Sequence, residues 1–311
     1  MEGVRWAFRC GSWSPTRAEW LLAARCVQRE EKERIGQFVF AKDAKSAMAG
    51  RLLIRKLVSD KMGIVWDQIR LERTPKGKPV VANPIADAGH QRWSFNVSHQ
   101  GDYAVLAAEP GVQVGVDVMK TSRPGSSSIP EFFRLMTRQF TEHEWNTIRA
   151  RGSEWEQLHT FHRHWTLKES FIKAIGTGLG FDLQRIEFHT SPLQIPQAQV
   201  CTGTRMHLDG EEEEDWTFEE CLLDQHHHVA VALSRGAAPA AAAAATAAEE
   251  EEAEREHCQP GLAGRSRPLK FTVLSFSELV SGAVPLSEED PAYWESFEKK
   301  QEAPTRQHNQ P

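Results

Sequence analysis

A chain of 311 residues, 40% of them hydrophobic and ten of them tryptophan, is longer than one average domain and can bury a large core, so we expect two lobes. The net charge of -6 arises from two acidic runs at 211–215 and 249–256; without their eleven carboxylates and Arg255, 36 basic and 32 acidic residues remain. Such a mildly basic body excludes an extended nucleic-acid surface and favours a small anionic ligand or an acidic partner.

The cysteines and the start of the chain bear on the cellular setting. Five cysteines, an odd number without a C-x-x-C spacing, predict neither a disulfide framework nor a zinc site. The first residues lack the apolar core of a signal peptide, and no run approaches the roughly 18 apolar residues of a membrane span. We therefore expect a soluble protein of the cytoplasm (cytosol) that has no membrane partner.

The first third of the sequence predicts mainly helices. Apolar residues recur at spacings of three and four over 17–27, 30–40 and 41–62, which is the period of an amphipathic helix. The basic segment RTPKGKP at 73–79 then predicts a loop, because it contains both Pro and Gly.

Two short strands follow, YAVLAAE at 103–109 and VQVGVDVMK at 112–120, with a Pro-Gly pair between them. The pattern predicts an antiparallel hairpin in which the valines of the second strand face a core and Asp117 faces away from it. A turn at the Pro-Gly pair would place Asp117 opposite Tyr103.

The second half predicts a helical region at about 130–174, followed by strands containing QRIEFH, RMHLDG, WTFEECLL and HHVAVALS. The last of these and the segment at 99–109 both place His before an apolar strand, which is weak evidence of an internal duplication. The Ala/Glu-rich residues 236–268 lack an amphipathic pattern and predict a low-complexity linker or insertion. Residues 269–297 should pack back on the body, whereas 298–311 predict a disordered tail.

A well-formed helix is predicted within WTLKESFIKAIGTGLGF at 165–181. Glu169 and Lys173 lie together on the side nearly opposite an apolar stripe. The pair is either a solvated i,i+4 ion pair, worth a few tenths of a kcal/mol, or a carboxylate and an ammonium presented to a reaction. The apolar stripe consists of Leu167, Phe171, Ala174 and Ile175.

Two other motifs are interpreted as structural. The glycines of GTGLG at 176–180 follow a helix, whereas a dinucleotide-binding loop follows a strand and opens a helix, so we interpret Gly176 as the helix stop. The adjacent histidines at 226–228 would point to opposite faces of a strand and cannot all converge on one metal ion.

Two polar segments have the chemistry to bind an anion. RTPKGKP places Arg73, Lys76 and Lys78 around a Pro and a Gly, which is either a solvated basic loop or a phosphate cradle. FNVSH at 95–99 supplies a hydroxyl and an imidazole at the mouth of the predicted hairpin. Asp117 alone is an ordinary strand carboxylate, and it becomes a site candidate only beside these groups.

Together these motifs resemble a known family. GVDVMK at 115–120, followed by WTLKESFIKAIGTGLG at 165–180, resembles the paired signature of the 4'-phosphopantetheinyl transferases, and RTPKGKP and FNVSHQGDYAVLA match the same family. The resemblance covers roughly residues 1–235. It implies an α+β fold of two similar α/β lobes, 1–118 and 119–235, which are related by pseudo-twofold symmetry and have the active site in the cleft between them.

The resemblance also implies an activity. Family members transfer the 4'-phosphopantetheine group from coenzyme A to a serine of an apo acyl or peptidyl carrier domain, depend on Mg²⁺ and release 3',5'-ADP. The implied partners are coenzyme A and carrier domains of the fatty acid synthase and aminoadipate-semialdehyde dehydrogenase types, modified by a monomer. The alternative is a non-catalytic coenzyme A-binding or carrier-protein interaction module, which would add no mass to an apo carrier.

The resemblance also implies which residues form the active site. The resemblance implies that Asp117, Glu169 and Lys173 are catalytic, with Asp117 and Glu169 as Mg²⁺ ligands and Glu169 also as a candidate acceptor of the serine proton. It implies a binding site for the phosphates and nucleotide of coenzyme A that is formed by Arg34, Arg73, Thr74, Lys76, Gly77, Lys78, Asn96, Ser98, His99 and Lys173.

One position departs from the family pattern. Many bacterial members read D-x-E at the first site, but here the third residue is Met119, which cannot bind a hard cation. The predicted hairpin would bring the segment SHQGD at 98–102 close to Asp117. Gln100 is therefore the expected third metal ligand, and a water molecule is the alternative.

Overall fold

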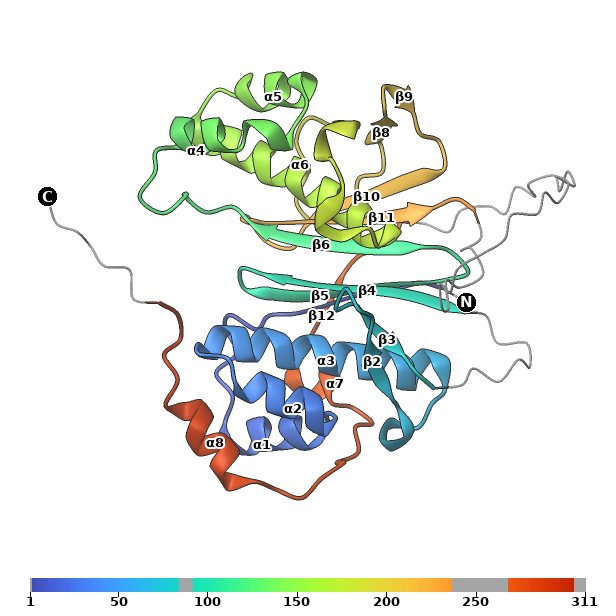
Figure 1. Ribbon diagram of the computed structural model, residues 1–311, viewed down its shortest axis with the longest axis vertical. Helices are drawn as coiled ribbons and strands as arrows, with labels where there is room; N and C mark the ends of the chain where they lie inside the picture. The colour runs from blue at the N-terminus through green and yellow to red at the C-terminus, as the bar shows by residue number, and fades with distance from the viewer. Residues whose placement is uncertain (1, 84–91, 237–267, 305–311) are drawn as a thin grey trace, which may run out of the picture.

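The computed structural model describes residues 2–83, 92–236 and 268–304, and its two main β-sheets pack face to face (Figure 1). In spatial order the first sheet contains β12 (Thr272–Leu274), β1 (Val4–Phe8), β5 (Tyr103–Pro110) and β4 (Trp93–Gln100). The second contains β10 (Trp216–Leu222), β11 (His227–Ser234) and β6 (Val114–Lys120).

Helices cover the outer side of each sheet, as Figure 1 shows. Those on the first sheet are α1 (Arg17–Arg25), α2 (Arg29–Gly36) and α3 (Ala41–Met62), which confirm the three predicted helices. Those on the second are α4 (Ile129–Leu135), α5 (Glu142–Arg149) and α6 (Glu154–Ile175). Small ribbons complete the body: β2 (Leu71–Arg73) with β3 (Pro79–Val81), and β7 (Ile186–His189) with β8 (Arg205–Leu208) and β9 (Glu211–Glu212).

The two sheets are built in the same order along the chain. In each, a first strand (β1 or β6) leads through helices to a long helix (α3 or α6), and then through short strands to a hairpin (β4–β5 or β10–β11). The second hairpin strand, β5 or β11, lies beside the first strand of its sheet. The weak sequence similarity that we noted therefore joins strands at corresponding positions.

The core between the sheets is lined by the alternating valines. Val114, Val116 and Val118 are fully buried and pack with residues such as Val105 of β5 and Val229 of β11. This confirms that the valines face a core. Asp117 points to the other face of β6, but α6 covers that face, so the residue is only 4% exposed.

The predicted hairpin between 103–109 and 112–120 is wrong. β5 pairs with β4 and β1, whereas β6 pairs with β11. The hairpin is instead β4–β5, in which Gln100 faces Tyr103 and Gly101 takes a φ of 64°, a left-handed conformation that suits a two-residue turn. Both edges of β5 are thus occupied, and none is left for β6.

β6 belongs to the second sheet. The chain therefore passes from the first sheet to the second between Pro110 and Val114, rather than at the boundary of 118 and 119 implied by the resemblance. The linker expected at 236–268 lies almost wholly outside the described residues.

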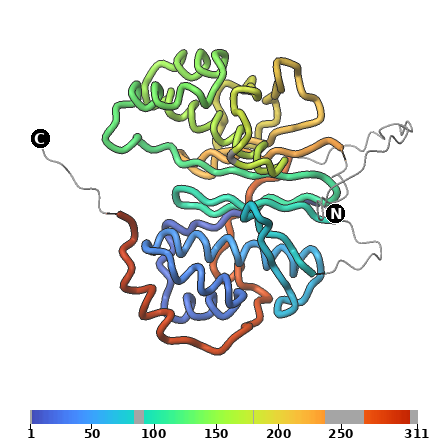
Figure 2. Tube along the Cα trace, viewed as in Figure 1, coloured from blue at the N-terminus to red at the C-terminus, as the bar shows by residue number. Residues whose placement is uncertain are grey.

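The C-terminal segment packs on the first half of the molecule (Figure 2). β12 pairs in parallel with β1, and α7 (Phe276–Leu279) and α8 (Pro291–Glu298) follow it. Phe297 of α8 stacks on Trp20 of α1 with ring centroids 3.8 Å apart.

The expected disorder of 298–311 is wrong for the first residues of this range. The amide of Ala41 donates to the Gln301 carbonyl at 2.8 Å, and Lys45 forms an ion pair with Glu302 at 2.8 Å. The first of these contacts occupies a free amide at the start of α3, where a helix lacks internal acceptors. Residues 305–311 lie outside the described part of the chain.

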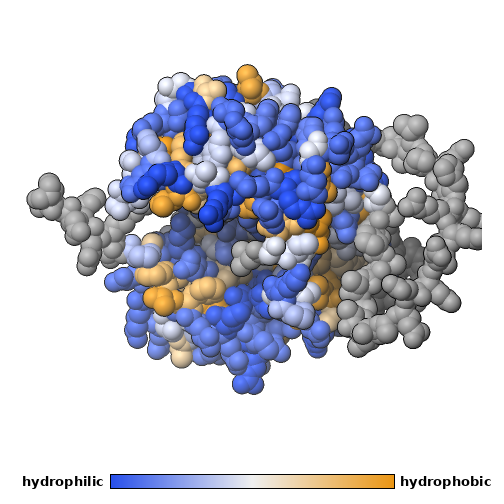
Figure 3. All heavy atoms as spheres, turned by 45° about the horizontal axis from the view of Figure 1, so that its top comes forward, coloured by the Kyte–Doolittle hydropathy of each residue, from blue (hydrophilic) through white to orange (hydrophobic). Residues whose placement is uncertain are grey.

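The molecular surface is mostly hydrophilic on the face shown in Figure 3, and it is hollowed between the two halves. Among the described residues, no helix combines the length and the apolar character needed to cross a bilayer.

Candidate active site

β4 and β6 meet at the junction of the two sheets through side chains of β4. The amide of Val116 donates to Asn96 Oδ1 at 3.0 Å, and the Ser98 hydroxyl donates to Asp117 Oδ1 at 2.8 Å. Alternate residues of a strand share a face, so one polar face of β4 runs along the edge of β6. The first half thereby supplies a hydroxyl group directly to Asp117 and an amide oxygen to the backbone of Val116.

Lys173 of α6 completes this cluster. Its Nζ donates to Asp117 Oδ1 at 2.5 Å and to the Ser98 hydroxyl at 2.9 Å. Three side chains from β4, β6 and α6 thus converge, as the family resemblance implied for these positions. The solvated i,i+4 pair with Glu169 is not the arrangement found, because the ion-pair partner of Lys173 is Asp117.

Glu169 lies one turn before Lys173 and is half-buried. Burial raises the pKa of its carboxyl group, the negative charge of Asp117 raises it further, and Lys173 offsets part of the rise. Asp117 Oδ2 is buried without a hydrogen-bond partner among the described residues. Two carboxylates therefore share one lysine, which leaves the cluster with excess negative charge.

The position of α6 against β6 depends on a glycine. A Cβ atom on Gly115 would lie 2.0 Å from the carbonyl oxygen of Ser170, so any other residue would push the helix and the strand apart. A capping box of Ser153 and Glu156 begins α6, and Gly176 ends it with a φ of 71°, which confirms the predicted helix stop. The predicted apolar stripe is confirmed as well, since Leu167, Phe171 and Ala174 are buried in one cluster, against which Ile175 packs.

A buried ion pair that was not predicted from the sequence holds the middle of α6. Lys168 Nζ lies 2.8 Å from Glu144 Oε2 of α5, and both side chains are at most 1% exposed. Lys168 also donates to the carbonyls of Leu183 and Ile186 at 2.7 Å. Because these partners fully pair the buried Lys168, they fix the rotation of α6 about its axis. The next residue, Glu169, then faces the junction.

The predicted basic loop connects β2 to β3 and reaches the second half of the molecule. Lys76 Nζ donates to the carbonyls of Gly176 and Thr177 at 3.2 Å, at the C-terminus of α6, where a cation is favourable. Gly77 takes a φ of 81°, and its amide donates to the Thr74 carbonyl at 2.7 Å. Lys78 is partly buried, which lowers the pKa of its ammonium group.

Three arginines surround one glutamate beside this loop. Arg73 and Arg34 both donate to the Glu31 carboxylate at 3.0–3.1 Å, and Arg51 Nη1 lies 3.6 Å from it. Burial would raise the pKa of Glu31, but the arginines hold it below its ordinary value. Even after Glu31 is counted, the cluster keeps two positive charges.

Arg51 is the residue of this cluster that was not predicted from the sequence. It lies in α3, is 8% exposed, and its Nε and Nη1 atoms have no hydrogen-bond partner among the described residues. Burial lowers the pKa of Arg51 to about 10, and the charges of Arg73 and Arg34 lower it too. The sequence does give one indication of its role, because Arg51 is a charged residue among the apolar residues of a predicted helix.

His99 and Gln100 lie at the end of β4, both exposed. Enough protein surrounds His99 for desolvation to lower its pKa, and the charges of Lys173 and Arg51 add to the effect. Gln100 Oε1 accepts a hydrogen bond from the amide of Lys120 at 2.6 Å. The hairpin argument that placed Gln100 near Asp117 is thus wrong, although Gln100 does share the polar face of β4 with Ser98.

Two of the three adjacent histidines, His227 and His228, lie in β11, and they have different partners. His227 bonds to Asp224 at 2.7 Å and accepts from the amide of Asp102 at 3.0 Å. His228 bonds to His159 of α6 at 3.1 Å. For these two residues, the prediction that adjacent histidines point to opposite sides of the strand is confirmed.

The arrangement as a whole suits an anionic ligand and a divalent cation. Two hard carboxylates from β6 and α6 face one another, and the arginine cluster and the loop lysines supply positive charge beside them. Carboxylate oxygens are the protein ligands that Mg²⁺ prefers, whereas arginine and lysine bind phosphate.

Comparisons with known proteins agree with this chemistry. The family model described as 4'-phosphopantetheinyl transferase, N-terminal, matches residues 11–111, and that of the 4'-phosphopantetheinyl transferase superfamily matches 113–232. The chain is similar to the L-aminoadipate-semialdehyde dehydrogenase-phosphopantetheinyl transferase of Homo sapiens, at 56% identity over 98% of this chain and 94% of the relative. The Xenopus laevis protein of the same name is 57% identical over 99% and 95%. A phosphopantetheinyl transferase of Thraustochytrium sp. is 40% identical over 72% and 76%.

Proposed function

Since the chain belongs to the 4'-phosphopantetheinyl transferase superfamily and is a transferase that acts on carrier proteins, we propose that it transfers the 4'-phosphopantetheine group of coenzyme A to a serine of an apo carrier domain and releases 3',5'-ADP. One observation carries the assignment of the site: Asp117, Glu169 and Lys173 converge with Ser98 where the two halves of the molecule meet.

The residues at this junction fit Mg²⁺. Asp117 Oδ2 is buried without a partner, and Glu169 makes no hydrogen bond or ion pair within the described residues. We propose that Asp117 and Glu169 hold the ion, with Gln100 or a water molecule as a further oxygen ligand. Bound there, Mg²⁺ would neutralise the charge of the coenzyme A pyrophosphate.

The side chains divide the chemistry of transfer between them. The carrier serine gives its proton to Glu169, whose raised pKa suits proton acceptance. The serine oxygen attacks the β-phosphorus of coenzyme A, and the bond from that phosphorus to the oxygen of 3',5'-ADP breaks. Lys173 stabilises the negative charge on the leaving phosphate.

The remaining cations have the geometry to hold the rest of coenzyme A. We propose that Arg34, Arg51 and Arg73 bind phosphate, because their combined charge exceeds that of Glu31 and because Arg51 has unused donors. The amides and side chains of the basic loop and of β4 complete the proposed binding surface: Thr74, Lys76, Gly77, Lys78, Asn96, Ser98 and His99.

We further propose that the two halves are lobes related by pseudo-twofold symmetry, with the active site in the cleft between them. The matched strand orders and the two 22-residue helices, each ended by a left-handed glycine, support this proposal. The names of the animal relatives suggest a carrier domain of the aminoadipate-semialdehyde dehydrogenase type as one substrate, with fatty acid synthase carriers as another. A cytoplasmic monomer completes the proposal.

The experiment that tests this function is mass spectrometry of an apo carrier domain after incubation with the protein, coenzyme A and Mg²⁺. The carrier should gain the mass of one phosphopantetheine group, and chelation of the metal should prevent the gain. A protein that binds coenzyme A but leaves the carrier mass unchanged would be the non-catalytic module.

A further inference from the structure

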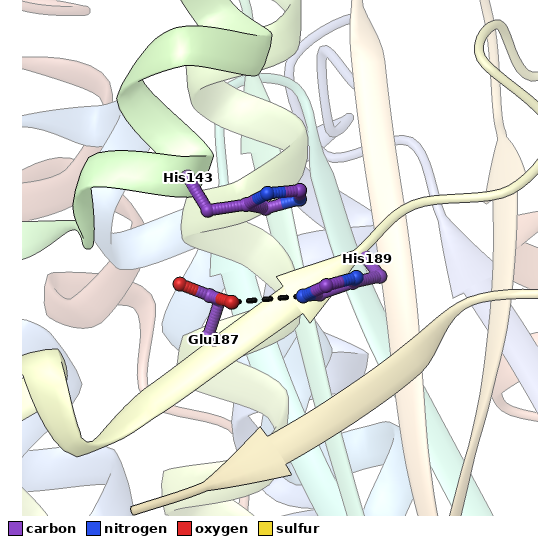
Figure 4. Close-up of side chains that lie close together, drawn as sticks. All are labelled: His143, Glu187 and His189. Atoms are coloured by element: carbon purple, nitrogen blue, oxygen red, sulfur yellow. Dashed lines mark hydrogen bonds and ion pairs between the residues drawn. The ribbon is translucent and has the colours of Figure 1, made fainter. Parts of the chain in front are cut away.

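A second group of metal-binding side chains lies in the second half, on elements that contribute none of the catalytic side chains proposed above. His143 of α5 and Glu187 and His189 of β7 lie together (Figure 4), and one ligand atom from each is within 4.8 Å of the other two. His189 Nε2 and Glu187 Oε1 are 2.8 Å apart.

The scaffold explains why these groups meet. Glu187 and His189 are two residues apart on β7 and share one face, and α5 packs against this strand. The amide of Phe188, which lies between them, donates to Glu144 Oε1 at 3.0 Å. Glu144 directly follows His143 and is fully buried, so the backbone of α5 is fixed beside the two strand residues.

A third histidine adjoins the group. His207 of β8 faces Glu187 in the strand ladder, and its ring centroid is 4.2 Å from that of His189. The Nδ1 atom of His207 is buried without a hydrogen-bond partner among the described residues. An unused buried nitrogen costs free energy, and coordination of an ion after a turn of the His207 ring would remove that cost.

We propose that His143, Glu187 and His189 form a binding site for a zinc-type transition-metal ion, with His207 as the fourth ligand. Two or three imidazoles with one carboxylate are a donor set typical of zinc, whereas Mg²⁺ takes oxygen ligands. This site therefore differs in metal preference from the carboxylates Asp117 and Glu169, and it does not depend on the transfer reaction.

Metal binding requires a small rearrangement. The rings of His143 and His189 are stacked, with centroids 4.0 Å apart and an interplanar angle of 11°, so their lone pairs lie in nearly parallel planes and do not converge on one point. Ligand atoms around a tetrahedral zinc ion are about 3.4 Å apart. His143 is exposed and lies in the first turn of α5, so its ring can turn toward the other two.

The test is Zn²⁺ titration of the full-length protein with excess Mg²⁺ present to occupy the carboxylate site. Co²⁺ serves as a spectroscopic probe, since tetrahedral Co²⁺ absorbs visible light strongly. We expect His143→Ala and Glu187→Gln each to weaken Zn²⁺ binding at least tenfold and to abolish the tetrahedral Co²⁺ bands. The matched control is His226→Ala, which removes an exposed histidine elsewhere and should leave the affinity within about twofold.

Two further readouts separate the site from a general loss of structure. Zn²⁺ should raise the midpoint of thermal unfolding of the wild type but not of His143→Ala, whose substitution at an exposed position should leave the metal-free midpoint almost unchanged. Transfer activity with Mg²⁺ should be the same in both proteins. Equal Zn²⁺ affinity in the wild type and His143→Ala, or the absence of tetrahedral Co²⁺ bands from the wild type, would overturn the proposal.

Discussion

Lys173 forms its ion pair with Asp117 of β6, at 2.5 Å, although Glu169 lies one turn away on the same helix. Glu169 is thus left without a cation partner of its own, and burial and the neighbouring Asp117 carboxylate both raise its pKa. The proximity of two carboxylates is unfavourable, because like charges repel. A divalent cation between the carboxylates would remove the repulsion, which is the physical basis for the proposed metal site.

Asp117→Asn should remove the Mg²⁺-dependent part of coenzyme A affinity while keeping the fold. The amide retains Oδ1, to which Ser98 and Lys173 donate, and replaces the unpartnered oxygen with a nitrogen that cannot bind the ion. Calorimetric titration of coenzyme A with and without Mg²⁺ measures the effect. If Mg²⁺ strengthens binding to the variant as much as to the wild type, Asp117 is no ligand.

Neutralising Arg73, Lys76 and Lys78 together should raise KM for coenzyme A far more than it lowers kcat. The three cations supply charge to the bound phosphates, whereas the proposed catalytic groups remain in place. Dephospho-coenzyme A should be affected less than coenzyme A if the cations contact the 3'-phosphate. Equal losses for both donors would move the contact to the pyrophosphate. Lys299→Ala, at the exposed residue that follows α8, is the control.

Local periodicity was sufficient to predict much of the site. The apolar stripe of α6, its stop at Gly176 and the position of Glu169 off that stripe all follow from a helical period and the conformational freedom of glycine. The valine face of β6 follows from strand alternation in the same way. These features depend on residues close together in the sequence, so they were available without a structure.

Strand pairing could not be obtained in this way. A Pro-Gly pair between two alternating strands is a good hairpin signal. However, β4 directly precedes β5 and pairs with it through the tighter turn at Gly101, whereas β6 pairs with the distant β11. The error carried over to Gln100, which was placed by that register. Arg51 was missed for a related reason, since helical periodicity does not reveal which cations a fold gathers around Glu31.

Unfolding should become easier in mild acid because α6 carries two buried neutral histidines. Burial lowers the pKa of His162 to about 4 and of His164 to about 3, whereas both bind protons near 6.5 once unfolded. Their contribution to stability is therefore complete above about pH 6.5 and declines as the pH falls below it, by about 1.4 kcal/mol per histidine at pH 5.5.

Urea unfolding of the wild type and of His164→Leu at about pH 7.5 and 5.5 measures this contribution. The leucine variant should lose about 1.4 kcal/mol less between the two pH values than the wild type does. An identical pH dependence in the two proteins would mean that His164 is protonated in the folded state.

Phe297→Ala should destabilise the protein by about 3–5 kcal/mol, because it leaves a cavity against Trp20. The result would establish that the C-terminal segment contributes to the core of the first half. Val284→Ala, at a position 41% exposed in the same segment, should change the free energy of unfolding by less than about 1 kcal/mol. Similar small losses for both variants would show that α8 is loosely attached.

The most direct test of the account is the rate at which Glu169→Gln modifies an apo carrier domain, followed by mass spectrometry beside the wild type. The substitution keeps the volume of a side chain that lies off the buried stripe of α6, so circular dichroism should show an unchanged fold. We predict that the rate falls by orders of magnitude, because a neutral amide neither holds Mg²⁺ nor accepts the serine proton. A folded variant that keeps more than about a tenth of the wild-type kcat, which corresponds to a loss of less than about 1.4 kcal/mol of transition-state stabilisation, would contradict the assignment of this junction as the active site.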